Sequence, residues 1–275
     1  MNRIEERFQN LKNDGRKGLI IYIGAGDPDL EATRRLAIEF DRIGVDVLEL
    51  GVPFSDPLAD GVVNQLAAQR GLQSGTTPPG VLRSVVEIRK SAQIPIVLYI
   101  YYNLVFRYGL ERFIKDAAEA GVDGLLVLDL PPDEAGKYHD LMNGYGLCPI
   151  YLIAPTTPEE RIKFIVNRAR GFVYYVSREG VTGMQSGVPE SLPAMVSVIK
   201  KHTSLPVAVG FGISNSEQAK IVAQHADAVV VGSAVVDRIG KMGKSSDMVT
   251  NVTRFVQELS KAVKLAEDYE LHKGE

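Results

Sequence analysis

The chain has 275 residues, of which 45% are hydrophobic and 24% are charged, and its formal net charge is −3. These values are ordinary for a globular protein and argue against disordered, fibrous and membrane-spanning classes. Lysine and arginine are spread along the chain without a basic stripe, so we expect no nucleic-acid partner. No apolar run approaches the ~20 residues that a membrane span needs, and residues 1–16 are charged and helical in pattern. We therefore expect a cytoplasmic protein without a secretory signal.

Short apolar or β-branched runs recur along the chain and predict eight strands, at residues 19–23, 47–50, 96–100, 125–128, 150–153, 172–176, 207–209 and 228–231. Segments with a period near 3.6 lie between them and predict helices, at residues 30–43, 81–90, 110–120, 134–141, 158–168, 192–201 and 216–223, with a long last helix at 248–265. The strands are continuous hydrophobic runs rather than alternating ones. This is typical of a parallel sheet whose two faces are both covered.

Eight strand–helix units in this length average roughly 34 residues each, which suits a closed barrel. The sequence has neither a second core nor a Pro/Ser-rich linker, so we expect one α/β domain over residues 1–275. That domain is a (β/α)8 TIM barrel with an extra N-terminal helix and a long C-terminal helix. The alternative is an open doubly wound sheet with a dinucleotide site after its first strand. Residues 24–29 begin such a glycine motif, but Asp29 stands where the third glycine belongs.

The single cysteine and the histidines offer little chemistry. Cys148 stands beside Pro149 without a nearby histidine to activate it, which favours a small buried hydrophobe over a nucleophile. The histidines all fall in or beside segments with a helical pattern, which favours surface or packing roles: His139, His202, His225 and His272. The sequence therefore predicts no metal site.

Two carboxylates fall where a barrel gathers its chemistry, because groups at the carboxyl ends of the strands surround one mouth. Glu49 lies within the second apolar run, where burial should raise its pKa; the alternative is an interior ion pair with a lysine or arginine. Asp60 lies in the following loop, residues 51–61, and its alternative role is a helix cap. For Asp56, in the same loop, capping or turn formation is the favoured role.

Three later segments combine glycine with strand ends or helix starts, at residues 180–183, 210–212 and 232–234. Glycine lets backbone N–H groups approach an anion closely, and a helix N-terminus adds a favourable dipole. Barrels of this type often bind phosphate after strands seven and eight, where the last two segments fall. A phosphorylated substrate is therefore expected, and the alternative is that these glycines serve tight turns only.

Residues 48–61, LELGVPFSDPLADG, resemble the signature of the tryptophan synthase alpha subunit family. Other segments are similar to later parts of the family in the same order, at residues 101–103, 121–124, 129–131, 174–177, 180–183, 209–213 and 231–233. The resemblance covers residues 17–240 and is far more specific than a short motif. It implies a lyase of tryptophan biosynthesis that splits indole-3-glycerol phosphate into indole and glyceraldehyde 3-phosphate.

The resemblance also assigns roles to individual residues. Glu49 is expected to act as a general acid and then as a base. Asp60, on a wetter loop, is expected to stay ionised and to hold the indole N–H. Aromatic walls and the glycine segments are expected to contact substrate, through Tyr22, Tyr99, Tyr175, Thr182, Gly183, Gly212, Gly232 and Ser233. Residues 180–183 are a candidate lid in which Thr182 closes toward Asp60.

The resemblance implies no cofactor in this chain and a pyridoxal-phosphate-dependent beta subunit as its partner, in an alpha2beta2 heterotetramer. The docking face is expected at the barrel mouth, on Asp56, Pro57 and residues 103–108. Four positions differ from what relatives commonly carry, which leaves the pocket shape and loop closure open: Val62, Asn64, Leu128 and Met184. The alternatives are another phosphate-binding barrel enzyme, a lyase that works alone and a catalytically silent regulatory subunit.

Overall fold

The structure is a computed structural model that describes residues 1–176, 189–210 and 212–266. Eight parallel strands form a closed barrel in sequence order, with β1 paired to both β2 and β8. Their bounds are β1 Gly18–Gly24, β2 Val47–Gly51, β3 Ile96–Ile100, β4 Gly124–Val127, β5 Cys148–Ile153, β6 Val173–Val176, β7 Val207–Gly210 and β8 Ala228–Val231. All eight predicted strands are present, and the closed order confirms the TIM barrel over the open sheet.

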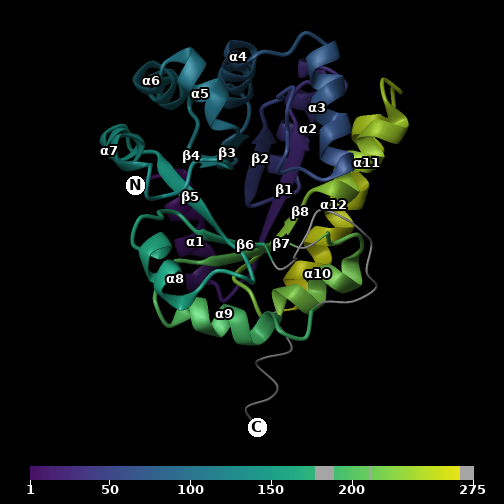
Figure 1. Ribbon diagram of the computed structural model, residues 1–275. Helices are drawn as coiled ribbons and strands as arrows, with labels where there is room; N and C mark the ends of the chain where they lie inside the picture. The colour runs from purple at the N-terminus through teal and green to yellow at the C-terminus, as the bar shows by residue number, and fades with distance from the viewer. Residues whose placement is uncertain (177–188, 211, 267–275) are drawn as a thin grey trace.

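Helices pack around the strands, and all of them except α1 form an outer layer (Figure 1). They are α1 Arg3–Asn13, α2 Leu30–Arg42, α3 Val62–Gln73, α4 Pro78–Arg89, α5 Tyr102–Tyr108, α6 Leu110–Ala120, α7 Gly136–Gly144, α8 Glu159–Val166, α9 Leu192–Lys200, α10 Ser216–Ala223, α11 Ser233–Met242 and α12 Met248–Leu265. Residues 103–108, which are part of the expected docking face, belong to the short helix α5. Within the described part of the chain, no helix is long and apolar enough to cross a membrane.

Side chains alternate along each strand between the barrel interior and the layer beneath the helices, because successive residues of a strand point to opposite faces. Ile20, Val47 and Val97 belong to the interior cluster, whereas their chain neighbours Ile21 and Leu48 pack in the outer one. The same alternation turns every second residue at a strand's carboxyl end toward the mouth. It therefore decides which polar side chains can take part in a site there.

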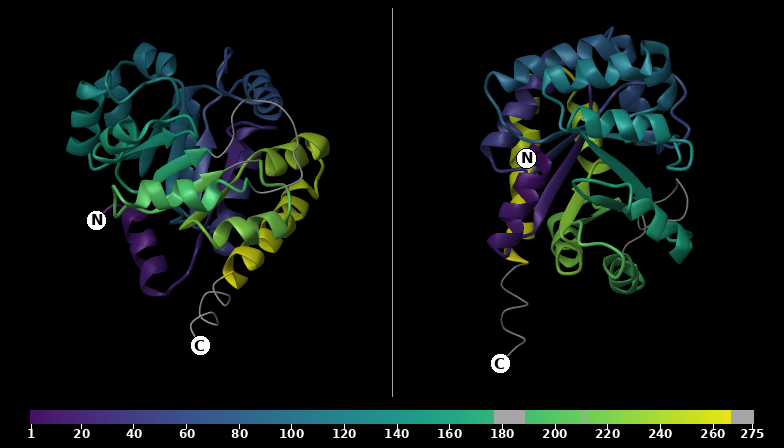
Figure 2. Two further views of the ribbon diagram at one scale, coloured as in Figure 1. Left: turned by 60° about the horizontal axis from the view of Figure 1, so that its bottom comes forward. Right: turned by 90° about the vertical axis from the view of Figure 1, so that its left-hand side faces the viewer.

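Helix α1 packs against the interior cluster and lies where the N-terminus is labelled (Figure 2). Its apolar residues Ile4, Phe8 and Leu11 join that cluster, and the Phe8 ring lies 5.5 Å from the Phe172 ring. Cys148 is fully buried in the same cluster, and burial raises the pKa of its thiol to about 12. The expected packing role of this cysteine is confirmed.

Three aspartates tie neighbouring strands together where β2, β4 and β8 begin. Each carboxylate accepts a 2.8 Å hydrogen bond from a backbone N–H group of the neighbouring strand. The donors are Leu19 for Asp46, Ile96 for Asp123 and Val207 for Asp227. Each also pairs with basic side chains: Arg7 with Asp46, Arg3 and Arg89 with Asp123, and Lys200 with Asp227. Polar residues at this end of a TIM barrel stabilise the fold, whereas the opposite end carries the chemistry.

Candidate active site

Glu49 is a buried carboxyl group in an apolar strand. It lies on β2 in register with Tyr22 of β1 and Val97 of β3, and only 1% of it is exposed. Among the described residues its Oε1 has no hydrogen-bond partner, and no ion pair to Glu49 is found there. The salt-bridged alternative is therefore not observed. Burial raises the pKa of Glu49 to about 8, in the predicted direction.

Asp60 is held by two tyrosines from the neighbouring strand and its end. The hydroxyl of Tyr99 donates to Oδ1 and that of Tyr101 to Oδ2, both at 2.8 Å. The Tyr101 hydroxyl accepts a 3.0 Å hydrogen bond from the backbone N–H of Ala59, which fixes its orientation. The β2–α3 loop thus carries the carboxylate, and two hydroxyl groups at the end of β3 hold it in place.

The expectation of a wetter environment for Asp60 was wrong. The residue is 5% exposed, because Tyr99 and Tyr101 cover its carboxylate. Burial raises the pKa of Asp60, and the hydrogen bonds from the two tyrosines oppose that rise. The ionised form of Asp60 is therefore stabilised by these donors rather than by solvent.

The helix-cap alternative for Asp60 is also contradicted. The residue at the cap of α3 is Gly61, and no side-chain hydrogen bond caps this helix. The carboxylate of Asp60 faces the tyrosines instead. Asp56 lies in an exposed turn, where its carbonyl accepts a 3.0 Å hydrogen bond from the N–H of Leu58.

Two of the three expected aromatic residues lie inside the barrel. Tyr22 and Tyr99 share one cluster, with ring centroids 4.9 Å apart in an edge-on arrangement. Tyr175 was assigned to the wrong face, because it packs in the outer cluster and is 1% exposed. Tyr174 joins the interior cluster, and burial followed by the nearby Glu49 raises the pKa of its hydroxyl.

Tyr174 and Tyr101 were therefore not among the residues predicted from the sequence. Tyr174 could have been predicted from the alternation of side chains along β6, because neighbouring residues of a strand point to opposite faces and only one of the two tyrosines can face the interior. Tyr101 directly follows β3, and its hydroxyl is recognisable as a site group only once loop and strand are seen together. Tyr22, Tyr99, Tyr101 and Asp60 line one small cavity at the ends of β1 to β3.

The glycine segments after β7 and β8 are partly described. Gly212 is exposed and has a positive φ of 69°, a backbone conformation that favours glycine. Gly232 precedes α11, whose first residue is Ser233, and a Cβ at Gly232 would lie 3.4 Å from the Tyr22 ring. The start of α11 thus lies beside the aromatic cluster. Thr182 and Gly183 lie outside the described residues.

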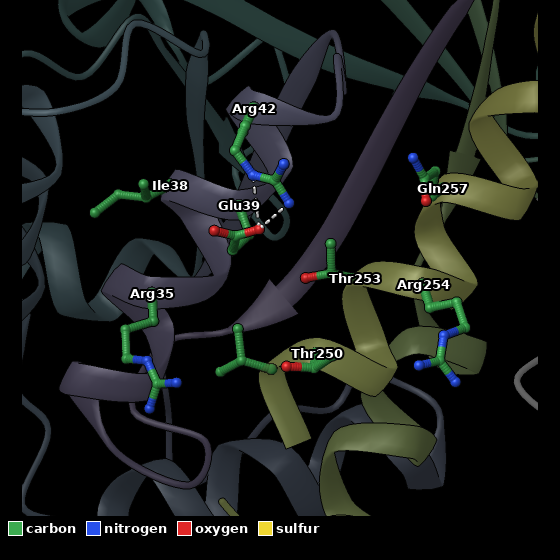
Figure 3. A pocket seen from close by; sticks show the side chains of 9 residues that line it. Arg35, Ile38, Glu39, Arg42, Thr250, Thr253, Arg254 and Gln257 are labelled. Carbon is green, nitrogen blue, oxygen red and sulfur yellow. Dashed lines mark hydrogen bonds and ion pairs between the residues drawn. The ribbon is translucent and has the colours of Figure 1, made fainter. Parts of the chain in front are cut away.

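A second groove, of about 440 Å³, lies between α2 and α12 on the outer surface (Figure 3). Arg35 and Arg42 reach it from α2, and Thr253 and Arg254 from α12. None of the carboxylates or tyrosines described above lines it. Burial raises the pKa of Asp46 and Asp123 as well, but these pair with arginines where β2 and β4 begin. Glu49 and Asp60 lie at the mouth, where a pair of carboxyl groups with disfavoured charge is typical of catalytic sites.

Comparison with known proteins gives a consistent result over nearly the whole chain. A family model described as Tryptophan synthase alpha chain matches residues 8–264. A protein of that name from Opitutus terrae is 51% identical over 250 residues, which cover 91% of this chain and 94% of that protein. Another from Geotalea daltonii is 46% identical over 263 residues, which cover 96% and 99% of the two chains.

Solved structures agree with the sequence comparison. Tryptophan synthase subunit alpha from Legionella pneumophila superposes with a TM-score of 0.87 at 38% identity, covering 96% of this chain and 98% of that one. A chain of the aminoacrylate-bound tryptophan synthase from M. tuberculosis gives 0.85 at 32% identity, with 96% and 100% covered. The buried carboxylate pair, the barrel and these comparisons together show that the chain belongs to the tryptophan synthase alpha chain family.

Proposed function

We propose that the chain is a lyase that splits indole-3-glycerol phosphate into indole and glyceraldehyde 3-phosphate, with Glu49 and Asp60 as its catalytic pair. The observation that carries the proposal is the state of Glu49. This carboxyl is buried, has an Oε1 without a partner among the described residues, and has a pKa raised to about 8. A group of this kind is protonated at neutral pH and can still release its proton.

The reaction is a retro-aldol cleavage and needs two proton movements. A proton added to C3 of the indole ring leaves a positive charge on the ring nitrogen. A base then removes the proton of the hydroxyl on the adjacent side-chain carbon. The bond between that carbon and C3 breaks, its electron pair returns to the ring, and the side chain leaves as an aldehyde. One carboxyl group that gives its proton to C3 can take up the hydroxyl proton, so the enzyme ends as it began.

Glu49 suits both steps. In its protonated form it is the general acid for C3, and as the resulting carboxylate it is the base for the hydroxyl. Its surroundings of Tyr22, Val97 and Tyr174 exclude water, which keeps the proton between enzyme and substrate. Asp27, which follows β1 and is equally buried, pairs with Arg70, whereas no ion pair to Glu49 is found among the described residues.

Asp60 suits the charge that develops on the ring nitrogen. Its two oxygens are fixed by Tyr99 and Tyr101, so the carboxylate needs no reorganisation when the positive charge forms. Each oxygen keeps acceptor capacity beyond its tyrosine hydrogen bond. The indole N–H is the natural donor to it.

The substrate phosphate is assigned to the segments after β7 and β8. The first backbone N–H groups of α11 have no partner within the helix, as at any helix start, and the helix dipole favours an anion there. Gly212 and Gly232 allow close approach of the backbone, and Ser233 adds a hydroxyl. Thr182 and Gly183 remain a predicted lid and phosphate contact on sequence grounds.

The partner is a pyridoxal-phosphate-dependent beta subunit, which takes up the released indole. Exposed apolar side chains on the mouth support a docking surface there: Leu58 is 80% exposed, Val62 64% and Phe106 67%. They lie on the β2–α3 loop, which also carries Asp56 and Pro57, and on α3 and α5. Contact with these elements can order the Asp60 loop and raise turnover without a new catalytic group.

The test is an assay of the purified protein with indole-3-glycerol phosphate, with release of indole as the readout. Adding a beta subunit should give faster cleavage and a larger complex by size-exclusion chromatography. Release that is equally fast without the beta subunit indicates a lyase that works alone. Absence of release under both conditions contradicts the proposal.

A further inference from the structure

Within the described residues, four buried side-chain atoms have no hydrogen-bond partner, and two of these atoms lie on β2 and in the first turn of α3. One is Oε1 of Glu49, which the proposed function explains. The other is Oδ1 of Asn64, which it leaves unexplained. A buried carbonyl oxygen without a donor costs free energy in the folded protein, and a ligand that donates a hydrogen bond to it removes that cost.

Asn64 is close to the catalytic aspartate. It is the third residue of α3, four residues after Asp60 and one turn before Ala68. Ala68 lines the small cavity together with Asp60 and Tyr101, and residues four apart lie on the same face of a helix. The side chain of Asn64 also lowers the pKa of Asp60, as an amide N–H donor beside a carboxylate does.

We propose that Asn64 is a substrate-positioning residue whose Oδ1 accepts a hydrogen bond from the indole N–H, which it shares with Asp60. This inference rests on the proposed function. Both oxygens of Asp60 already accept hydrogen bonds from tyrosine hydroxyls, so a second acceptor improves the fit of the ring nitrogen. The N–H becomes a stronger donor as positive charge forms on it, and the shared hydrogen bond strengthens in the transition state.

The proposal predicts that one substitution at Asn64 raises the stability of the protein and lowers its activity. Asn64→Leu keeps the approximate size of the side chain and removes both polar atoms. The melting temperature should rise, because an unpaired buried acceptor is gone, while kcat/KM for indole release should fall about tenfold. Loss of the amide donor should also move the acid limb of the pH profile of kcat/KM upward. Gln69→Leu, at an exposed position of α3, is the matched control and should change none of these quantities.

A binding experiment isolates the contact from turnover. Indole and benzofuran have nearly the same shape, but benzofuran has a ring oxygen in place of the N–H. The wild-type protein should bind indole more tightly than benzofuran, and Asn64→Leu should reduce that preference about fivefold or more. Asn64→Met serves as the second variant if Asn64→Leu does not fold.

Two results would overturn the inference: a kcat/KM of the variant within twofold of wild type, or an unchanged preference for indole over benzofuran. Failure of the wild-type protein to release indole from indole-3-glycerol phosphate would instead count against the proposed function. The binding preference does not depend on turnover, so the two failures are distinguishable.

Discussion

The hydroxyl of Tyr99 on β3 donates a 2.8 Å hydrogen bond to Oδ1 of Asp60, which lies in the loop after β2. Tyr99 also packs edge-on against Tyr22 in the barrel interior. One side chain therefore connects the aromatic cluster to the carboxylate that is proposed to face the ring nitrogen. Burial raises the pKa of Asp60, and this contact opposes that rise.

Tyr99→Phe should raise the pKa of Asp60, because the lost hydrogen bond opposes the effect of burial. Asp60 acts as a carboxylate, so the acid limb of the kcat/KM profile should move to higher pH, by about one unit if the hydrogen bond contributes about 1.5 kcal/mol. Tyr145→Phe, at a more exposed position away from the mouth, is the control. An acid limb that stays in place would show that Tyr99 does not tune Asp60.

Glu49→Gln should change how stability depends on pH. The pKa of Glu49 is raised from 4.5 to about 8 by burial. Between these values the folded protein holds a proton that the unfolded chain releases, so the wild-type free energy of unfolding should fall as pH rises, by several kcal/mol. The variant lacks this contribution.

The two proteins should therefore have similar stability near pH 4.5, and the variant should be the more stable one above pH 8. Urea unfolding at several pH values gives the difference directly. Parallel stability curves across this range would mean that Glu49 is ionised in the folded state.

Ser233→Asp should raise KM more than it lowers stability, because it places a negative charge at the start of α11 where the substrate phosphate is proposed to bind. A tenfold or greater increase is expected, since each ~1.4 kcal/mol of lost binding is a factor of ten. Ser233→Ala keeps the backbone N–H groups and should have a much smaller effect. Equal KM values for both variants would place the phosphate elsewhere.

Phe106→Ser and Leu58→Ser should weaken the complex with the beta subunit and reduce its activation of indole release, with little effect on the isolated chain. Both side chains are exposed and apolar, so their replacement removes contact area without opening a cavity. Leu72→Ser, at 41% exposure near the end of α3, is the control. Full activation of both variants would place the interface on another surface.

The barrel can be predicted from the sequence because the same pattern, an apolar run followed by a segment with helical periodicity, occurs eight times. Eight apolar runs separated by periodic segments leave few other architectures, and β3, α6 and α12 begin and end where the periodicity places them. Helix α5 is less visible, because seven residues that start with Tyr102 and Asn103 are too short for a periodic pattern.

The environment of a candidate site residue can be predicted from the sequence where its position alone is unusual. Glu49 is an ionisable residue inside an apolar strand, and burial alone accounts for its raised pKa. The environment of Asp60 depends on Tyr99 and Tyr101, about 40 residues later in the chain, so a local view of a polar loop gives the wrong solvation. The sequence places two tyrosines side by side, and only the structure shows that Tyr174 faces the barrel interior and Tyr175 the outer cluster. The prediction therefore named Tyr175 instead of Tyr174.

The most direct test of the catalytic assignment is the rate of indole release from indole-3-glycerol phosphate by Glu49→Gln, compared with wild type and with the exposed variant Glu134→Gln. Glutamine preserves size but neither donates an acidic proton nor accepts one, so kcat should fall by about a hundredfold or more while substrate still binds. Glu134→Gln should match wild type. A kcat for Glu49→Gln within about threefold of wild type would contradict the role of this carboxyl as the proton donor.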